Sequence, residues 1–238
     1  MSQMPPTSTP DTATQPLSAL LDARYSCRAY RPDAVPQATI EAILRVAQRT
    51  PSWCNSQPWH ITLTQPPATD RLRQALYARA AAGTSDEGAG YDIAPPAEYR
   101  GVYRERRREC GFGLYDSVGI AHGDRAASAA QALENFRLFG APHLALVTTD
   151  AALGSYGALD CGAWVNNFML AARERGVASI AQAALAAHGP FLRRWFNIPD
   201  DRHVVCGVSF GFEDLAHPAN RYRTTRAPMA EVVRWIDE

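Results

Sequence analysis

The chain has 238 residues, of which 46% are hydrophobic and 20% are charged, so its length allows one large domain or two small ones. Its 24 basic and 24 acidic residues cancel, which excludes a whole-protein field for binding nucleic acid or an anionic membrane surface. No apolar run reaches the ~18 residues that a membrane-spanning helix needs. The most apolar helical stretch is interrupted by Asp160, Asn166 and Asn167.

The five cysteines are odd in number and no two have Cys-x-x-Cys spacing, so the sequence predicts neither a disulfide scaffold nor a cysteine-rich metal site. The six histidines form no metal-binding motif, and we expect no metal. A reduced, cytoplasmic protein fits this pattern. Residues 1–15 are rich in Pro, Ser, Thr and Gln and lack the regions of a secretory signal, so we expect a disordered tail.

Hydrophobic periodicity predicts an irregular order of helices and strands after the tail. Helices are expected over residues 17–24, 36–50, 68–82, 99–118, 124–139, 156–175, 189–196 and 228–236. Strands are expected over 59–64, 143–149 and 204–212, and a loop or lid over 83–98. Because regular βα alternation and an internal linker are both missing, we expect a single α+β domain over residues 16–238.

Two arginines and a hydroxyl stand at alternate positions after the first helix, as Arg24, Ser26 and Arg28. In an extended segment such side chains point the same way, and paired guanidinium groups suit a phosphate. A solvated basic loop is the alternative. Near the other end of the chain, Arg223 and Arg226 lie in a second basic run, which is either a further clamp on an anion or a solvated face.

Residues 51–59 read Pro-Ser-Trp-Cys-Asn-Ser-Gln-Pro-Trp. The prolines restrict the backbone, and the amides of Asn55 and Gln57 offer donors and acceptors that a planar heterocycle could meet. A tight connection whose amides satisfy their own backbone is the alternative. No side chain presents itself as the catalytic one: Cys54 and His60 lack the third, orienting group of a nucleophilic site.

Taken in order, these segments resemble the nitroreductase family of flavin mononucleotide (FMN) enzymes. The family's Arg-Arg-Ser-x-Arg opening reads Arg-Tyr-Ser-Cys-Arg over residues 24–28, with Tyr25 in place of the second arginine. Its Pro-Ser-x-x-Asn-x-Gln-Pro-Trp signature is met in full by residues 51–59. Gln182 and Ala183 resemble part of a Pro-Gln-Ala segment, and residues 223–228 resemble the closing phosphate motif.

The resemblance implies an intertwined homodimer, each half an antiparallel sheet flanked by helices, with two flavins at the interface. It implies that FMN is bound by Arg24, Tyr25, Ser26, Arg28, Pro51, Ser52, Trp53, Asn55, Gln182, Ala183, Arg223 and Arg226. The arginines and Ser26 would hold the phosphate and ribityl chain, and the loop at 51–55 would reach the ring of the other subunit's flavin. A backbone N–H at Gln182 or Ala183 would stabilise negative charge near flavin N5.

The function implied is an FMN-dependent oxidoreductase that passes hydride from NADH or NADPH to a small aromatic acceptor, either a nitroaromatic or a quinone. A flavin-dependent dehydrogenase or dehalogenase on a specialised substrate is one alternative, and a non-catalytic flavin-binding protein is another. Independently, the helix at 156–175 has Trp164, Val165, Phe168 and Met169 on more than one face. We therefore expect it to be buried against a partner subunit.

Overall fold

A four-stranded antiparallel sheet forms the centre of the computed structural model, which describes residues 16–83 and 89–237. The spatial order of the strands is β1-β2-β4-β3. Their bounds are β1 (His60–Leu63), β2 (His143–Asp150), β3 (Ala178–Gln182) and β4 (Arg202–Gly211). The expected α+β class and the antiparallel sheet are confirmed. The expected tail at residues 1–15 lies outside the described residues.

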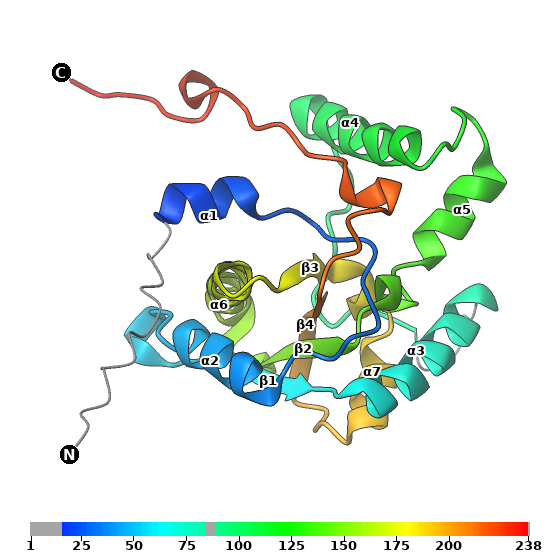
Figure 1. Ribbon diagram of the computed structural model, residues 1–238. Helices are drawn as coiled ribbons and strands as arrows, with labels where there is room; N and C mark the ends of the chain where they lie inside the picture. The colour runs from blue at the N-terminus through cyan, green and yellow to red at the C-terminus, as the bar shows by residue number, and fades with distance from the viewer. Residues whose placement is uncertain (1–15, 84–88, 238) are drawn as a thin grey trace, which may run out of the picture.

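Helices lie on both faces of this sheet (Figure 1). In chain order they are α1 (Leu17–Ala23), α2 (Gln37–Ala47), α3 (Pro66–Ala81), α4 (Gly101–Ser117), α5 (Arg125–Leu133), α6 (Gly154–Glu174) and α7 (Gly189–Phe196). Successive side chains of a strand point to opposite faces, and β2 follows this rule. Its Ala145 and Val147 pack with α2 and α6, whereas Leu144 and Leu146 pack with α3 and α7.

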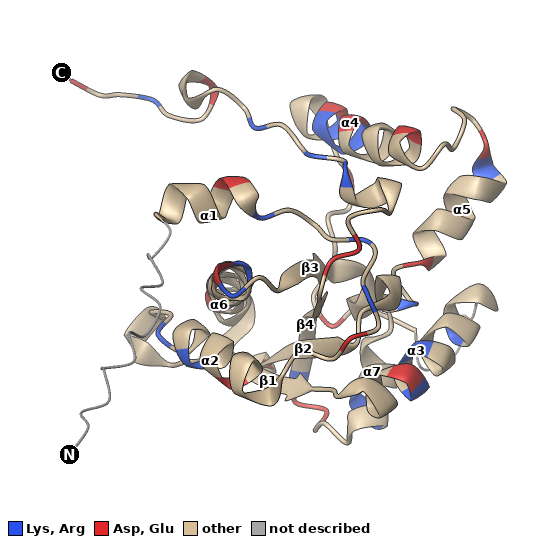
Figure 2. Cartoon of the chain, viewed as in Figure 1, with Lys and Arg blue, Asp and Glu red and all other residues tan. Residues whose placement is uncertain are grey.

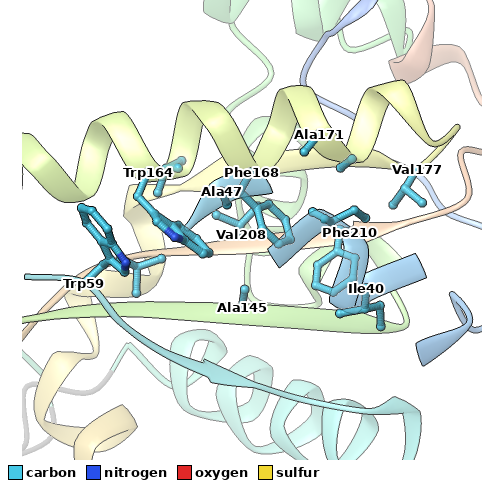
Figure 3. Packing of buried hydrophobic residues seen from close by; sticks show 14 of the residues in the cluster. Ile40, Ala47, Trp59, Ala145, Trp164, Phe168, Ala171, Val177, Val208 and Phe210 are labelled. Atoms are coloured by element: carbon cyan, nitrogen blue, oxygen red, sulfur yellow. The ribbon is translucent and has the colours of Figure 1, made fainter. Parts of the chain in front are cut away.

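Helix α6 buries its large side chains against the chain's own sheet. Trp164 and Phe168 stack with ring centroids 5.3 Å apart, and Phe168 meets Phe210 of β4 edge to face at 5.4 Å (Figure 3). Val165 belongs to the same core, and Met169 packs against it. This protomer's own core therefore already covers these four side chains, and the burial of α6 against a partner subunit stays a prediction.

Three elements of the structure differ from the expectation. Strand β3 was missed, because five residues of mixed polarity carry little strand signal until β4 pairs with them. The helix expected over 124–139 ends at Leu133, and Leu138 and Phe139 adopt positive φ angles of 56° and 52°. The helix expected over 228–236 is only a short 3₁₀ turn, since a short helix needs a buried face and Trp235 is 78% exposed.

The segment after α1 and the segment after β4 run beside each other at the edge of the sheet (Figure 1). Arg31 N–H donates to the carbonyl of Phe212 at 2.9 Å. The buried side chain of Asn220 accepts from the Arg28 N–H at 2.7 Å and donates to the carbonyl of Ala29 at 2.8 Å. These bonds bring the two basic segments, which are almost 200 residues apart, to one place.

The buried ring of His143 should make stability fall in mild acid. Its Nε2 accepts from the Val35 N–H at 3.0 Å, and its Nδ1 lies 3.1 Å from the carbonyl of Thr64, so the proton is on Nδ1. Burial lowers the pKa of His143. The unfolded chain then takes up the proton first, and the free energy of unfolding should decrease as pH falls below about 6.5.

Denaturant titrations of the wild type and of His143→Gln between pH 5 and 8 measure this effect. The glutamine side chain can accept from Val35 but cannot titrate, so the variant should show a shallower pH dependence. Equal slopes for the two proteins would contradict the prediction.

Candidate functional site

Four arginines from both ends of the chain line one hollow of about 550 Å³. Arg24 and Arg28 come from the segment after α1, and Arg223 and Arg226 come from the segment after β4. Asp22 is the acidic residue among the lining side chains, so the hollow carries an excess of positive charge. Figure 2 shows basic residues along both segments. We refer to this cavity as the arginine hollow.

The positive charges of the arginines that line the arginine hollow repel one another. Burial lowers the pKa of Arg24, and the positive charge of Arg226 lowers it further. Burial also lowers the pKa of Arg28. Because arginine keeps its charge at neutral pH, the repulsion must be borne by the fold or relieved by a bound anion. The arrangement therefore suits a phosphate, whose oxygens accept the forked guanidinium donors.

A second hollow of about 260 Å³ adjoins the first and shares Ser26 and Arg28 with it. Its walls are Leu114 and Tyr115 of α4, Asn135, and residues 180–184 at the end of β3. We refer to it as the β3 hollow. The two hollows thus meet at Ser26 and Arg28, and the β3 hollow is the less charged of the two.

The side chain of Gln182 is fully engaged within the protein. Its Nε2 donates to the carbonyl of Asn135 at 2.9 Å, and its Oε1 accepts from the hydroxyl of Ser209. Gln182 is buried, whereas Ala183 is exposed beside it in the β3 hollow. This side chain therefore fixes the end of β3, and the backbone there is what a ligand would meet.

A third hollow of about 580 Å³ also touches Arg28. Arg73, Tyr77, Arg137 and Phe139 line it, and the Arg137 guanidinium lies 4.0 Å from the centre of the Tyr77 ring. The sequence analysis missed these residues, because isolated arginines on α3 and beyond α5 form no motif. Arg28 is the residue at which all three hollows meet.

The loop at residues 51–59 lies away from these hollows in the same chain. Pro51, Trp53 and Asn55 are exposed, and Ser52 is half-buried. Trp53 N–H donates to the carboxylate of Asp160 at 3.1 Å, and its ring lies 4.4 Å from that of Tyr156, so α6 holds the loop. The structure does not bring Pro51, Ser52, Trp53 or Asn55 together with the other predicted site residues.

The backbone of this loop is strained. Cys54, Asn55 and Gln57 have positive φ angles of 53°, 54° and 47°, which residues other than glycine rarely adopt. Each such residue costs ~1–3 kcal/mol and persists where neighbouring contacts impose it, commonly at functional sites. Contacts with α6 thus hold the loop in a strained shape on an exposed surface, away from the three hollows.

Part of the predicted lid is anchored. The Gly90 N–H donates to the carbonyl of Ala187 at 2.8 Å, and the Asp92 carboxylate accepts from the Val204 N–H at 2.8 Å. Asp92 also forms an ion pair with Arg193 of α7. Residues 84–88 lie outside the described residues. Helix α4, rather than residues 89–98, forms a wall of both the arginine and the β3 hollows.

Two further properties concern the described residues as a whole. No cluster of three His, Cys, Asp or Glu side chains within residues 16–83 and 89–237 could hold a metal ion. In the same part of the chain, no helix is long and apolar enough to cross a bilayer.

The sequence pattern of the nitroreductase family matches residues 21–212. The chain belongs to this family. The match includes the opening arginine segment, the loop at 51–59 and the end of β3. It stops before Arg223 and Arg226.

Individual nitroreductases align with nearly the whole chain. It is 33% identical to the nitroreductase NfnB of Mycolicibacterium smegmatis over 93% of each protein. It is 34% identical to a 4-nitrobenzoate reductase of a Nocardioides species, over 94% of this chain and 91% of the relative. A crystal structure of the FMN-dependent NfnB from Mycobacterium smegmatis in complex with NADPH superposes with a TM-score of 0.86 at 32% identity, covering 92% of this chain and 97% of that one.

Proposed function

We propose that this chain is an FMN-dependent oxidoreductase that passes hydride from NAD(P)H to nitroaromatic or quinone acceptors. The observation that carries the proposal is the pair of joined hollows, a basic one for a phosphate and a less charged one ending at the backbone of β3. FMN has these two ends, a phosphate and a flat ring system. Bound there, FMN would supply the two-electron hydride chemistry that amino-acid side chains lack.

The residues of the arginine hollow would hold the phosphate and the ribityl chain. Arg24, Arg28, Arg223 and Arg226 offer charge-assisted donors, and Ser26 offers a hydroxyl. Hydrogen bonds to charged groups contribute ~1.5–3 kcal/mol each. Because these donors come from segments that Asn220 already ties together, little ordering should be needed on binding.

The residues of the β3 hollow would meet the ring. The Gln182 side chain, tied to Asn135 and Ser209, holds the end of β3 in place. A backbone N–H at this end would place a fixed dipole beside the ring, where reduction adds negative charge. Since strands from both halves of the chain build one sheet, we propose that residues 16–238 act as one FMN-binding domain.

The reaction class is supported by the relatives, which are named as FMN-dependent and 4-nitrobenzoate-reducing enzymes. We take a small nitroaromatic as the first acceptor to test, and a quinone as the second. The cytoplasmic location remains a prediction from the sequence. A dehydrogenase or dehalogenase and a non-catalytic flavin protein are the competing functions.

Identifying the bound chromophore tests the proposal. The purified protein should be yellow, and heat should release FMN, identified by chromatography and mass. Recovery of FAD, or a colourless protein that FMN cannot reconstitute, would overturn it. Oxidation of NADH or NADPH should then be stimulated by 4-nitrobenzoate. Bound FMN without turnover of either acceptor class would favour the two competing functions over the proposed one.

We also propose that the active unit is a homodimer in which the loop at 51–55 completes the partner's site. Two exposed apolar surfaces support a second copy of this chain as the binding partner. One is the terminal segment, which extends from the body in Figure 1 and exposes Val232 (67%), Trp235 (78%) and Ile236 (69%). The other joins Trp53 (61%) of the loop to Tyr156 (57%) of α6.

Mixing two defective subunits tests this arrangement directly. Asn55→Ala damages the loop and Arg226→Ala damages the arginine hollow, so each variant alone should bind FMN weakly. If the loop acts on the partner's site, dissociation and random reassembly of equal amounts should restore roughly a quarter of the sites. About half of the dimers are then mixed, and one of the two sites in each mixed dimer combines an intact loop with an intact arginine hollow. FMN bound at subsaturating concentration measures this. No restoration would place the loop and the hollow in the same subunit's site, and a monomer that retains FMN would exclude the dimer.

Two glycines of α4 provide a matched pair of substitutions. A Cβ on Gly113 would lie 2.4 Å from the Tyr222 ring, which lines the arginine hollow, whereas a Cβ on Gly111 would meet nothing within 4 Å. Gly111→Ala should stabilise the helix by ~0.5–1 kcal/mol and leave FMN affinity unchanged. Gly113→Ala should displace Tyr222 and weaken FMN binding. Thermal unfolding and FMN titration of both variants check this, and equal FMN affinities would contradict it.

A further inference from the structure

Tyr25 stands where the family's opening motif has an arginine, and its contacts explain the exchange. The guanidinium carbon of Arg223 lies 3.5 Å from the centre of the Tyr25 ring. We propose that Tyr25 is a positioning residue, whose ring holds Arg223 ready for the phosphate of FMN. This inference rests on the proposed function, because it takes FMN as the ligand of the arginine hollow.

Arg223 needs such support because its side chain is exposed. Two backbone carbonyls fix one nitrogen of its guanidinium: Nη1 donates to Asn220 at 2.7 Å and to Tyr222 at 2.9 Å. The Tyr25 ring supplies the flat face against which the whole group rests. A cation within ~6 Å of a ring face is attracted to it. The remaining donors are then oriented before any anion arrives, which lowers the ordering cost of binding.

Tyr25 is itself held in place by Glu213. The residue is buried, and its hydroxyl donates to the carboxylate of Glu213. Glu213 in turn accepts from Arg173 of α6 at 3.0 Å, so the ring is anchored to the longest helix of the described chain. Burial and the bond to Glu213 raise the pKa of Tyr25, which keeps it neutral. A tyrosine therefore orients Arg223 without adding a fifth positive charge to the hollow.

Two ligands separate positioning from simple structural support. FMN carries the phosphate and riboflavin lacks it, so a residue that acts through Arg223 should affect FMN alone. Tyr25→Met removes the ring while nearly keeping its bulk, and we expect FMN to bind ~10-fold more weakly and riboflavin to bind unchanged. Tyr25→Phe keeps the ring and should stay within about threefold of the wild type for both ligands. Fluorescence titration of the flavin-free wild type and both variants measures all six constants.

Tyr99→Leu is the matched control, because it removes another tyrosine that supports an arginine, Arg107 at 5.3 Å, outside the three hollows. It should leave both affinities unchanged. A double-mutant cycle adds the link to Arg223: on an Arg223→Ala background, Tyr25→Met should weaken FMN binding by less than about twofold. If Tyr25→Met does not fold, Tyr25→Leu takes its place in the same cycle.

Three results would overturn the inference. Unchanged FMN affinity in Tyr25→Met would show that the ring does not position Arg223. An equal loss for FMN and riboflavin would assign Tyr25 to the general packing of the site. Full additivity with Arg223→Ala would separate the two residues. In contrast, a wild-type protein that binds neither ligand would overturn the proposed function itself.

Discussion

Replacing Arg226 with alanine is expected to raise the FMN dissociation constant by about 10- to 100-fold. Arg226 lines the arginine hollow together with Arg24, and its charge lowers the pKa of Arg24. Its own guanidinium is held by the hydroxyl of Thr224 at 2.8 Å, so it is presented in one orientation. Loss of one charge-assisted donor to the phosphate accounts for the size of the effect.

The chemistry should survive this substitution. The phosphate end of FMN is remote from the ring atom that receives hydride, so flavin reduction at saturating FMN should change little. Fluorescence titration measures the affinity, and stopped-flow reduction measures the rate. Arg221→Ala is the control, because Arg221 belongs to the same basic run, is exposed and lines none of the three hollows. Unchanged affinity combined with slow reduction would place Arg226 at the reacting end.

Phe168→Ala is expected to lower the free energy of unfolding by ~3–5 kcal/mol. The ring is completely buried, stacks on Trp164 and meets Phe210 of β4 edge to face (Figure 3). Its removal leaves a cavity between α6 and the sheet that rigid aromatic neighbours cannot fill. The loss is a large part of the stability of a typical domain.

Denaturant titration at fixed protein and FMN concentration measures this loss, since bound ligand and subunit association both shift apparent stability. Val46→Ala on α2 is the control: this side chain is 41% exposed, and the change should stay within about 0.5 kcal/mol. A similar small change for Phe168→Ala would mean that α6 is not packed on the sheet as described.

The sequence by itself determined most helices, three of the four strands and the residue types of the site. Strong periodicity decides such elements locally, as for Ile40 and Ile43 on α2. The sequence also identified the two arginine segments and the loop at 51–59. Their residues and spacing resemble the nitroreductase family, and that resemblance is confirmed. The dimer and the individual FMN contacts stay predictions.

Only the tertiary structure decided where these parts meet. The segments of Arg28 and Asn220 are joined by hydrogen bonds between residues 192 positions apart, and no local pattern encodes such a pairing. The burial of Trp164 and the exposure of Trp235 were likewise undecidable from their identities, because both are large apolar side chains. Strand β3 exists because β4 offers its backbone edge, and Tyr25 faces Arg223 because Glu213 holds its hydroxyl. Local propensity sets which elements can form, whereas burial and long-range hydrogen bonding choose which of them form and what each side chain touches.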